Sequence, residues 1–228
     1  MNSTILSTKR LSLSQKELLL NARIRFVEYD AISIEFLSFD LTNRYDFHLF
    51  TSQNAVKSFF ANAETKDYTF DVPAFCVGEK TKALLKSKGI TVQEMALNAE
   101  RLASLIIKKY NTHSFLFLSG NLRRDEIPLI LTKNNIRYDE VEVYKTTLNI
   151  KHFETVFDGV LFFSPSGVDS FIAKNALKNS TAFWNGNTTA QAAEKYTQQL
   201  IIANKPTIEN VLVQVVKAFS INVSWNSL

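Results

Sequence analysis

The chain has 228 residues, of which 46% are hydrophobic and 21% are charged, and it contains only 6 Gly and 4 Pro. This composition excludes a disordered or fibrous chain, and the length suits one large domain or two smaller ones. The formal net charge of +4 comes from Lys and Arg residues spread along the sequence. It therefore favours a small anionic ligand and gives little support to nucleic acid as a partner.

Cys76 is the only cysteine, which excludes a disulfide framework. Because it lies in the apolar run PAFCVG, we expect a buried structural thiol. No stretch approaches the ~20 apolar residues that are needed to cross a bilayer, and the first residues lack the apolar core of a signal peptide. We therefore expect a cytoplasmic protein with no membrane partner.

Short apolar runs alternate with segments of helical period, as is typical of a parallel sheet covered by helices. The sequence predicts strands at residues 4–8, 24–29, 46–51, 74–78, 114–119, 159–164, 181–185 and 199–203. It predicts helices at residues 13–22, 54–63, 79–89, 99–110 and 207–219, each with apolar residues three or four apart. The predicted fold class is α/β.

Two other stretches, residues 31–40 and 141–150, alternate between unlike side chains at every position. This period of two is typical of an extended strand with two different faces. Neither stretch has a helix nearby in the sequence. We therefore expect the two to pair with each other and to connect two domains.

The chain also contains an internal repeat. Residues 49–60 and 161–172 share Leu, Phe, Ser, Val, Ser and Phe in register, and Gly78 and Thr81 correspond to Gly186 and Thr189. We interpret the repeat as two similar domains, with the second inserted into the first. The expected boundaries are 1–31 with 151–228 for the first domain, 42–140 for the inserted domain, and 32–41 with 141–150 for the connecting ribbon.

The turns that follow the predicted strands are rich in Ser, Thr, Asn and Gly: TSQN, VGEKT, SGNLRR, SPSG and NGNTT. In a parallel sheet, ligands gather at the carboxyl ends of the strands, where each strand leads into a helix. The hydroxyl, amide and backbone N–H groups found there suit carboxylates or phosphates. The same residue types are ordinary helix caps, so each loop alone is open to both interpretations.

Other chemistry has little support in the sequence. The three histidines are scattered, so no metal site is expected, and no catalytic triad, phosphate-binding or dinucleotide-binding motif is present. Arg123 and Arg124 lie at the start of a predicted helix, where an arginine is unfavourable unless an anion is near. They are either an anion contact or a solvated surface pair.

Tyr144 is singled out by its position in VEVYKTT. Strict alternation places it on the same face as Glu142 and opposite Val141 and Val143, so we expect it to point away from the apolar side of the strand. Its phenol could donate a proton to a departing hydroxyl. The alternative is an ordinary exposed tyrosine.

Taken in order, the motifs FTSQNAV, AFCVGEKTKALLKSKGI, SGNLRRDEIPLIL, EVEVYKT, FFSPSGVDSF and GNTTA resemble the uroporphyrinogen-III synthase family over nearly the whole chain. The resemblance implies two flavodoxin-like domains with parallel sheets, joined by a two-stranded β ribbon, with the active site in the cleft between them. It also implies an enzyme that needs no cofactor, and we expect it to be a monomer.

In that family the substrate is hydroxymethylbilane, a linear tetrapyrrole with eight carboxylates. The resemblance implies loss of its terminal hydroxyl, attack of ring D through its substituted carbon, and ring closure with ring D inverted. Without the enzyme the substrate closes to the type I isomer. Control of the product is therefore a matter of positioning the chain.

Matching the motifs position by position makes Tyr144 the candidate that assists loss of water. The resemblance and the strand-end loops together imply the following substrate contacts: Ser52, Asn54, Thr81, Ser119, Gly120, Ser164, Ser166, Gly167, Thr188 and Thr189. The rival interpretation is a non-catalytic two-domain module that closes on a carboxylated metabolite.

Overall fold

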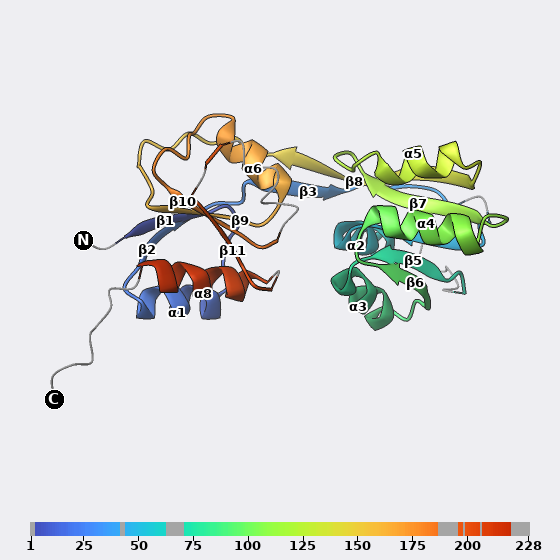
Figure 1. Cartoon of the computed structure of the whole chain (residues 1–228), viewed down its shortest axis with the longest axis horizontal. Helices are drawn as coiled ribbons and strands as arrows, with labels where there is room; N and C mark the ends of the chain where they lie inside the picture. The colour runs from blue at the N-terminus through green and yellow to red at the C-terminus, as the bar shows by residue number, and fades with distance from the viewer. Residues whose placement is uncertain are drawn as a thin grey trace. The chain divides into compact units, whose positions relative to one another are not determined.

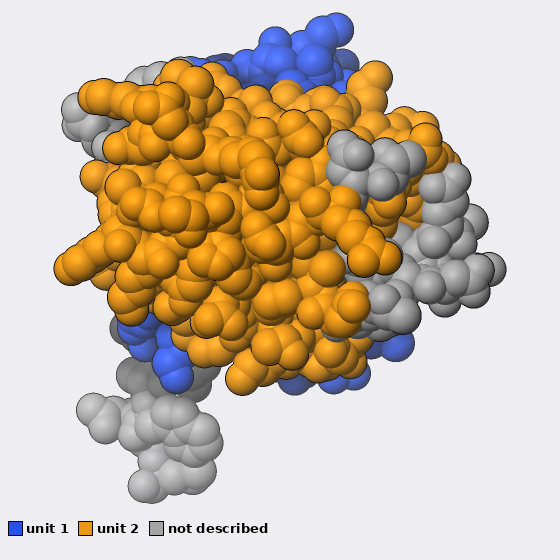
Figure 2. All heavy atoms as spheres, turned by 90° about the vertical axis from the view of Figure 1, so that its right-hand side faces the viewer, with its two compact units in different colours: residues 1–33, 147–228 blue, residues 34–146 orange. Residues whose placement is uncertain are grey.

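The computed structural model describes residues 3–41, 44–62, 71–186, 196–197, 199–205 and 207–219. Its contacts divide the chain into two units, coloured separately in Figure 2. Unit 1 comprises residues 1–33 and 147–228, and unit 2 comprises residues 34–146. The chain therefore leaves unit 1, builds all of unit 2, and returns. Thr188 and Thr189, two of the predicted site residues, lie outside the described residues.

Unit 1 is built on a parallel sheet in the order β11-β10-β9-β1-β2. Its strands are β1 (Thr4–Ser7), β2 (Arg25–Glu28), β9 (Gly159–Phe162), β10 (Thr181–Trp184) and β11 (Leu200–Ile202). In the sheet β1 pairs with β9, although the whole of unit 2 lies between them in the sequence. The pairing brings the ends of these two strands together.

Helices cover both faces of the unit 1 sheet (Figure 1). On one face, α1 (Leu13–Asn21) and α8 (Ile208–Phe219) pack on Ile5, Leu161 and Phe183. On the other, α6 (Pro165–Ile172) packs on side chains that include Leu6, Val160, Phe162 and Trp184. Successive apolar residues of β1, β9, β10 and β11 enter opposite clusters, as the period of two requires.

Unit 2 has a six-stranded sheet in the order β3-β8-β7-β4-β5-β6. The strands are β3 (Ile32–Phe36), β4 (Phe47–Phe50), β5 (Ala74–Val77), β6 (Val92–Ala96), β7 (Ser114–Gly120) and β8 (Arg137–Leu148). The pairs from β8 through β7, β4 and β5 to β6 are parallel. The Leu37 N–H donates to the Val143 carbonyl and the Asn149 N–H to the Ala31 carbonyl, so β3 runs antiparallel to β8.

The helices of unit 2 also form a layer on each face of the sheet. α2 (Gln53–Ala61) and α3 (Glu79–Ser87) contribute to one apolar cluster, which includes Phe50, Cys76 and Leu118. α4 (Ala99–Lys109) and α5 (Glu126–Lys133) contribute to the other, which includes Phe75 and Phe117. This parallel-dominated architecture confirms the predicted α/β class.

Cys76 and the two alternating stretches were the subject of local predictions. Cys76 is a buried free thiol, as predicted, and burial raises its pKa to about 11. The two alternating stretches do pair, as β3 and β8. However, β8 begins at Arg137 and pairs with β7 as far as Tyr144, so much of it belongs to the unit 2 sheet. β6 was absent from the predicted elements, and α5 and α6 were expected after their strand-end loops without assigned ranges.

His48 on β4 gives the stability a specific pH dependence. Its ring is 2% exposed and packs edge-on against Phe59, with ring centroids 5.4 Å apart. Burial lowers the pKa of His48 to about 4, and Asp71 acts in the opposite direction. Because the unfolded chain takes up this proton near pH 6.5 and the folded chain only near pH 4, stability falls as the pH drops through that window.

We expect the free energy of unfolding to decrease by about 2 kcal/mol between pH 7 and pH 5 through this histidine alone. Urea unfolding of wild type and His48→Leu at both pH values measures it. The pH-dependent loss should shrink in His48→Leu and persist in the matched control, His152→Leu, at an exposed position. An equal loss in His48→Leu and wild type would contradict the assignment.

Candidate active site

The carboxyl ends of the parallel strands collect polar side chains at one edge of each sheet. In unit 1 these are the turns after β1, β9 and β10. In unit 2 they are the turns after β4, β5 and β7. Each of the predicted site residues within the described part of the chain, apart from Tyr144, lies at or just beyond such a strand end.

In unit 1 the structure brings Ser164, Gly167 and Thr8 together. Ser164 is the N-cap of α6, and its Oγ accepts a hydrogen bond of 3.1 Å from the Gly167 N–H. A Cβ at position 167 would lie 3.3 Å from Ser164 Oγ and 3.6 Å from Thr8 Oγ1. Glycine therefore keeps the space beside two hydroxyls open. Thr8 was not among the predicted site residues, because its hydroxyl comes to lie near Gly167 only through the pairing of β1 with β9.

The side chains of Thr8 and Asn185 connect the strands at this edge of unit 1. Thr8 Oγ1 donates to the Leu161 carbonyl at 2.7 Å, which ties the end of β1 to β9. Asn185 Nδ2 donates to the Phe163 carbonyl at 3.0 Å, which ties the end of β10 to β9. Ser166, in the first turn of α6, is half-buried. The three strand ends are thus held in register by side chains.

In unit 2, Ser52 and Gly78 begin their helices in different ways. Ser52 is the N-cap of α2, and its Oγ accepts from the N–H of Asn54 at 3.1 Å. Gly78 begins α3 with φ of 87° and no side-chain cap. No N-cap side chain therefore bonds to the backbone N–H groups of the first turn of α3, and the helix dipole favours a negative charge there. Thr81, 5% exposed, lies in that turn.

Hydrogen bonds and ion pairs link the residues around the turn after β7. Ser119, 3% exposed, donates from Oγ to Glu140 Oε1 at 2.7 Å. Arg123 binds both oxygens of Glu140 and also contacts Asp125, and these partners raise the pKa of its guanidinium. The positive charge of Arg123 is thus compensated within unit 2. Arg124 is more exposed and lies 3.4 Å from Glu126.

The predicted orientation of Tyr144 is wrong. Its ring is partly buried and packs against the same apolar cluster as Val141 and Val143, instead of facing away from it. The cause is an irregularity in the pairing of β7 with β8: Ser119 pairs with Glu142, but Gly120 pairs with Tyr144. Because one residue is inserted in β8, strict alternation no longer predicts which way the tyrosine points.

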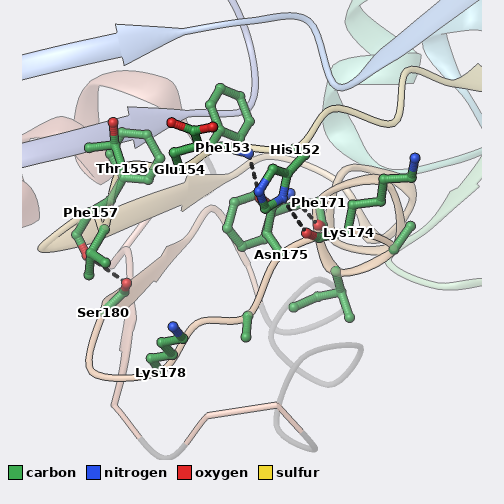
Figure 3. A pocket seen from close by; sticks show the side chains of 14 residues that line it. His152, Phe153, Glu154, Thr155, Phe157, Phe171, Lys174, Asn175, Lys178 and Ser180 are labelled. Carbon is green, nitrogen blue, oxygen red and sulfur yellow. Dashed lines mark hydrogen bonds between the residues drawn. The ribbon is translucent and has the colours of Figure 1, made fainter.

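A pocket of about 450 Å³ lies elsewhere in unit 1, at the amino ends of β9 and β10 (Figure 3). Its polar groups bond to nearby backbone. Asn175 Nδ2 donates to the Lys151 and Phe171 carbonyls, Ser180 Oγ donates to the Phe157 carbonyl at 2.6 Å, and His152 Nδ1 lies 3.0 Å from the Lys174 carbonyl. Because it lies at the opposite edge from the strand-end donors, we do not assign the substrate to it.

Within the described ranges, no three His, Cys, Asp or Glu side chains are grouped so that they could hold a metal ion. The helices described there include none that is long and apolar enough to cross a membrane. The strand ends carry hydroxyl, amide and backbone N–H groups. They can bind and orient an anionic ligand.

The fold and these strand ends define an α/β protein with parallel sheets and strand-end turns rich in neutral hydrogen-bond donors. Comparison with known proteins makes the assignment specific. The family model described as uroporphyrinogen-III synthase HemD matches residues 16–212, and the chain belongs to this family. The chain is accordingly a lyase-type enzyme of tetrapyrrole biosynthesis, and a non-catalytic binding module is not favoured.

Solved structures agree on the fold. Uroporphyrinogen-III synthetase from Helicobacter pylori 26695 is 20% identical, with a TM-score of 0.66 over 96% of this chain and 100% of that chain. A mutant uroporphyrinogen III synthase from Thermus thermophilus is 12% identical, with a TM-score of 0.69 over 95% of this chain and 98% of that chain. A search of curated protein sequences gave no match.

Gly78 provides a test of the open start of α3. Gly78→Ala should destabilise the protein by roughly 1–2 kcal/mol, because φ of 87° is unfavourable for alanine. Gly89, with φ of 83° just beyond the other end of α3, is the matched control, and Gly89→Ala should cost about the same.

Only Gly78→Ala should also raise KM for hydroxymethylbilane, since only that residue begins the uncapped turn. Thermal unfolding and steady-state kinetics of both variants separate the two effects. Equal KM values for the two variants would exclude the start of α3 as a substrate contact.

Proposed function

We propose that the chain converts hydroxymethylbilane into uroporphyrinogen III, by loss of the terminal hydroxyl and ring closure with inversion of ring D. The single observation that carries this proposal is the family match over residues 16–212. The strand-end donors support it, because the substrate carries eight carboxylates. Such a ligand suits many neutral donors and open helix starts better than a single charged cluster.

The enzyme has two tasks in this reaction. It must assist departure of the hydroxyl as water, and it must hold the bilane so that the substituted carbon of ring D reacts. The second task is one of orientation, because the unaided reaction already closes the ring but gives the type I isomer. Fixing the reacting groups in one geometry can contribute roughly 7–11 kcal/mol to a rate, enough to decide between two competing closures.

Tyr144 is the proposed proton donor to the departing hydroxyl. It is half-buried on β8, and its hydroxyl has no hydrogen-bond partner among the described residues. A phenol in this position can donate to a leaving oxygen without competing with a partner inside unit 2. Its ring packs against the apolar cluster, which limits the positions that the hydroxyl can take.

The proposed contacts to the carboxylates lie where strands lead into helices. They comprise the helix starts and strand ends named by the sequence: Ser52, Asn54, Thr81, Ser119, Gly120, Ser164, Ser166, Gly167, Thr188 and Thr189. The hydroxyls of Ser52 and Ser164 already accept from backbone N–H groups, and each can still donate its own proton to a carboxylate. Thr8, beside Gly167, joins this set on the geometry of unit 1.

We further propose that the enzyme is a cytoplasmic monomer that acts without a cofactor. Its single, buried cysteine suits a reducing compartment. The expected domains are residues 1–31 with 151–228, and 42–140, joined by a ribbon of residues 32–41 and 141–150. Light scattering after size-exclusion chromatography measures the oligomeric state.

Product analysis tests the proposed function. Freshly made hydroxymethylbilane, incubated with the purified protein, should yield mainly the type III isomer once the products are oxidised and separated by chromatography. The no-enzyme control gives type I. A protein that binds the substrate but leaves type I as the product would be the rival binding module.

Substitutions separate the proton donor from the binding groups. Tyr144→Phe should lower kcat at least about tenfold, because it removes the hydroxyl and keeps the ring. Ser164→Ala should lower activity only about two- to fivefold and cost roughly 1 kcal/mol of stability, since it removes one cap among many donors. Complete inactivation by Ser164→Ala in a folded protein would contradict a site built from many weak contacts.

A further inference from the structure

The pairing of β7 with β8 is irregular where Tyr144 lies. Ser119 is opposite Glu142 and Gly120 is opposite Tyr144, so Val143 is an additional residue in β8. A bulge of this kind bends the strand and redirects the side chains that follow it. The bulge could move to a neighbouring residue of β8 unless other groups held it at Val143.

The Val143 carbonyl is fixed from two directions within unit 2. The Leu37 N–H, just after β3, donates to it at 2.9 Å. Ser58 Oγ, on α2 and 1% exposed, also donates to it. Both lone pairs of this carbonyl are therefore used, and the bulge is held at one residue.

Gly120 provides the seat for the ring of Tyr144. A Cβ at position 120 would overlap the Cζ, Cε1 and Cε2 atoms of that ring. The ring thus lies directly on the glycine backbone, in space that a side chain of any other residue would fill. Glycine is required here by the close approach of the ring.

Asn121 continues the pairing of β8 after β7 has ended at Gly120. Its Oδ1 accepts from the Thr146 N–H at 2.7 Å, and its Nδ2 donates to the Thr146 carbonyl at 3.1 Å. Its own N–H donates to the Tyr144 carbonyl at 3.4 Å. The side-chain amide of Asn121 therefore takes the place of a strand partner at Thr146. Tyr144 is held between this pair on one side and the fixed bulge on the other.

We infer that Asn121 is a positioning residue, which fixes the hydroxyl of Tyr144 for departure of the substrate hydroxyl by pairing with Thr146 while Gly120 seats the ring. The inference rests on the proposed function. A proton donor that moves by about 1 Å can lose ~10²-fold in rate, so a group that holds its backbone affects turnover without touching the substrate.

A double-mutant cycle tests this role. Asn121→Ala should lower kcat roughly tenfold in the wild-type background, with little change in KM. In a Tyr144→Phe background the same substitution should lower kcat less than about twofold, because there is no hydroxyl left to misplace. Asn121→Asp keeps the acceptor for the Thr146 N–H, so it should recover part of the rate.

Asn134→Ala is the matched control. Asn134 also binds backbone through its side chain, donating to the Ile130 carbonyl at 2.8 Å at the end of α5 in the same unit. Its loss should leave kcat unchanged in both backgrounds. Thermal unfolding of every variant detects a purely structural effect, and Asn121→Asp replaces Asn121→Ala in the cycle if the alanine variant does not fold.

Equal losses of kcat from Asn121→Ala in the two backgrounds, or an effect on KM alone, would overturn the inference. Two other results would contradict the proposed function or the role of Tyr144 instead. Absence of type III product from the wild type removes the proposed function. Full activity of Tyr144→Phe, in a protein that does form type III product, removes the role of Tyr144 and with it that of Asn121.

Discussion

The backbone N–H groups at the start of a helix have no partner within the helix, and this constraint shapes the candidate site. Most strands of the two parallel sheets lead to such a helix start at the same edge. α2 and α6 meet the need with Ser52 and Ser164, whereas α3 begins at Gly78 and leaves its first turn uncapped. The carboxylates of a polyanionic substrate can accept hydrogen bonds from such uncapped N–H groups.

The residues around Tyr144 on β8 control the position of its side chain. Many neutral donors can hold a flexible polyanion, but they do not by themselves place a proton donor. The bulge at Val143, the seat at Gly120 and the Asn121–Thr146 pair fix Tyr144 from within unit 2 alone. In the proposed mechanism, binding and proton donation are thus carried by different elements. This division accounts for the modest effect expected from any single binding residue.

The sequence predicted the α/β class, most strands and the polar strand ends, because apolar periodicity and turn composition are local signals. β6 was missed because VQEMA is too polar to resemble a strand, and the ranges of α5 and α6 were not assigned because these helices are short. The orientation of Tyr144 failed for another reason. The bulge at Val143 is held by hydrogen bonds from Ser58 and Leu37, which lie far from it in the sequence. The alternation of residues along β8 therefore does not reveal it. Thr8 and Asn121 were likewise found only through their partners in space.

In the proposed function, the carboxylates of the tetrapyrrole bind at the strand-end donors. The most direct measurement is mapping of backbone amide NMR shifts as uroporphyrin III, the stable oxidised form of the product, is added. Binding at the strand ends should produce saturable shifts at Glu79 to Thr81 in the first turn of α3 and at Gly167 in α6. Shifts confined to the pocket around His152 and Asn175, with these helix starts unchanged, would contradict it.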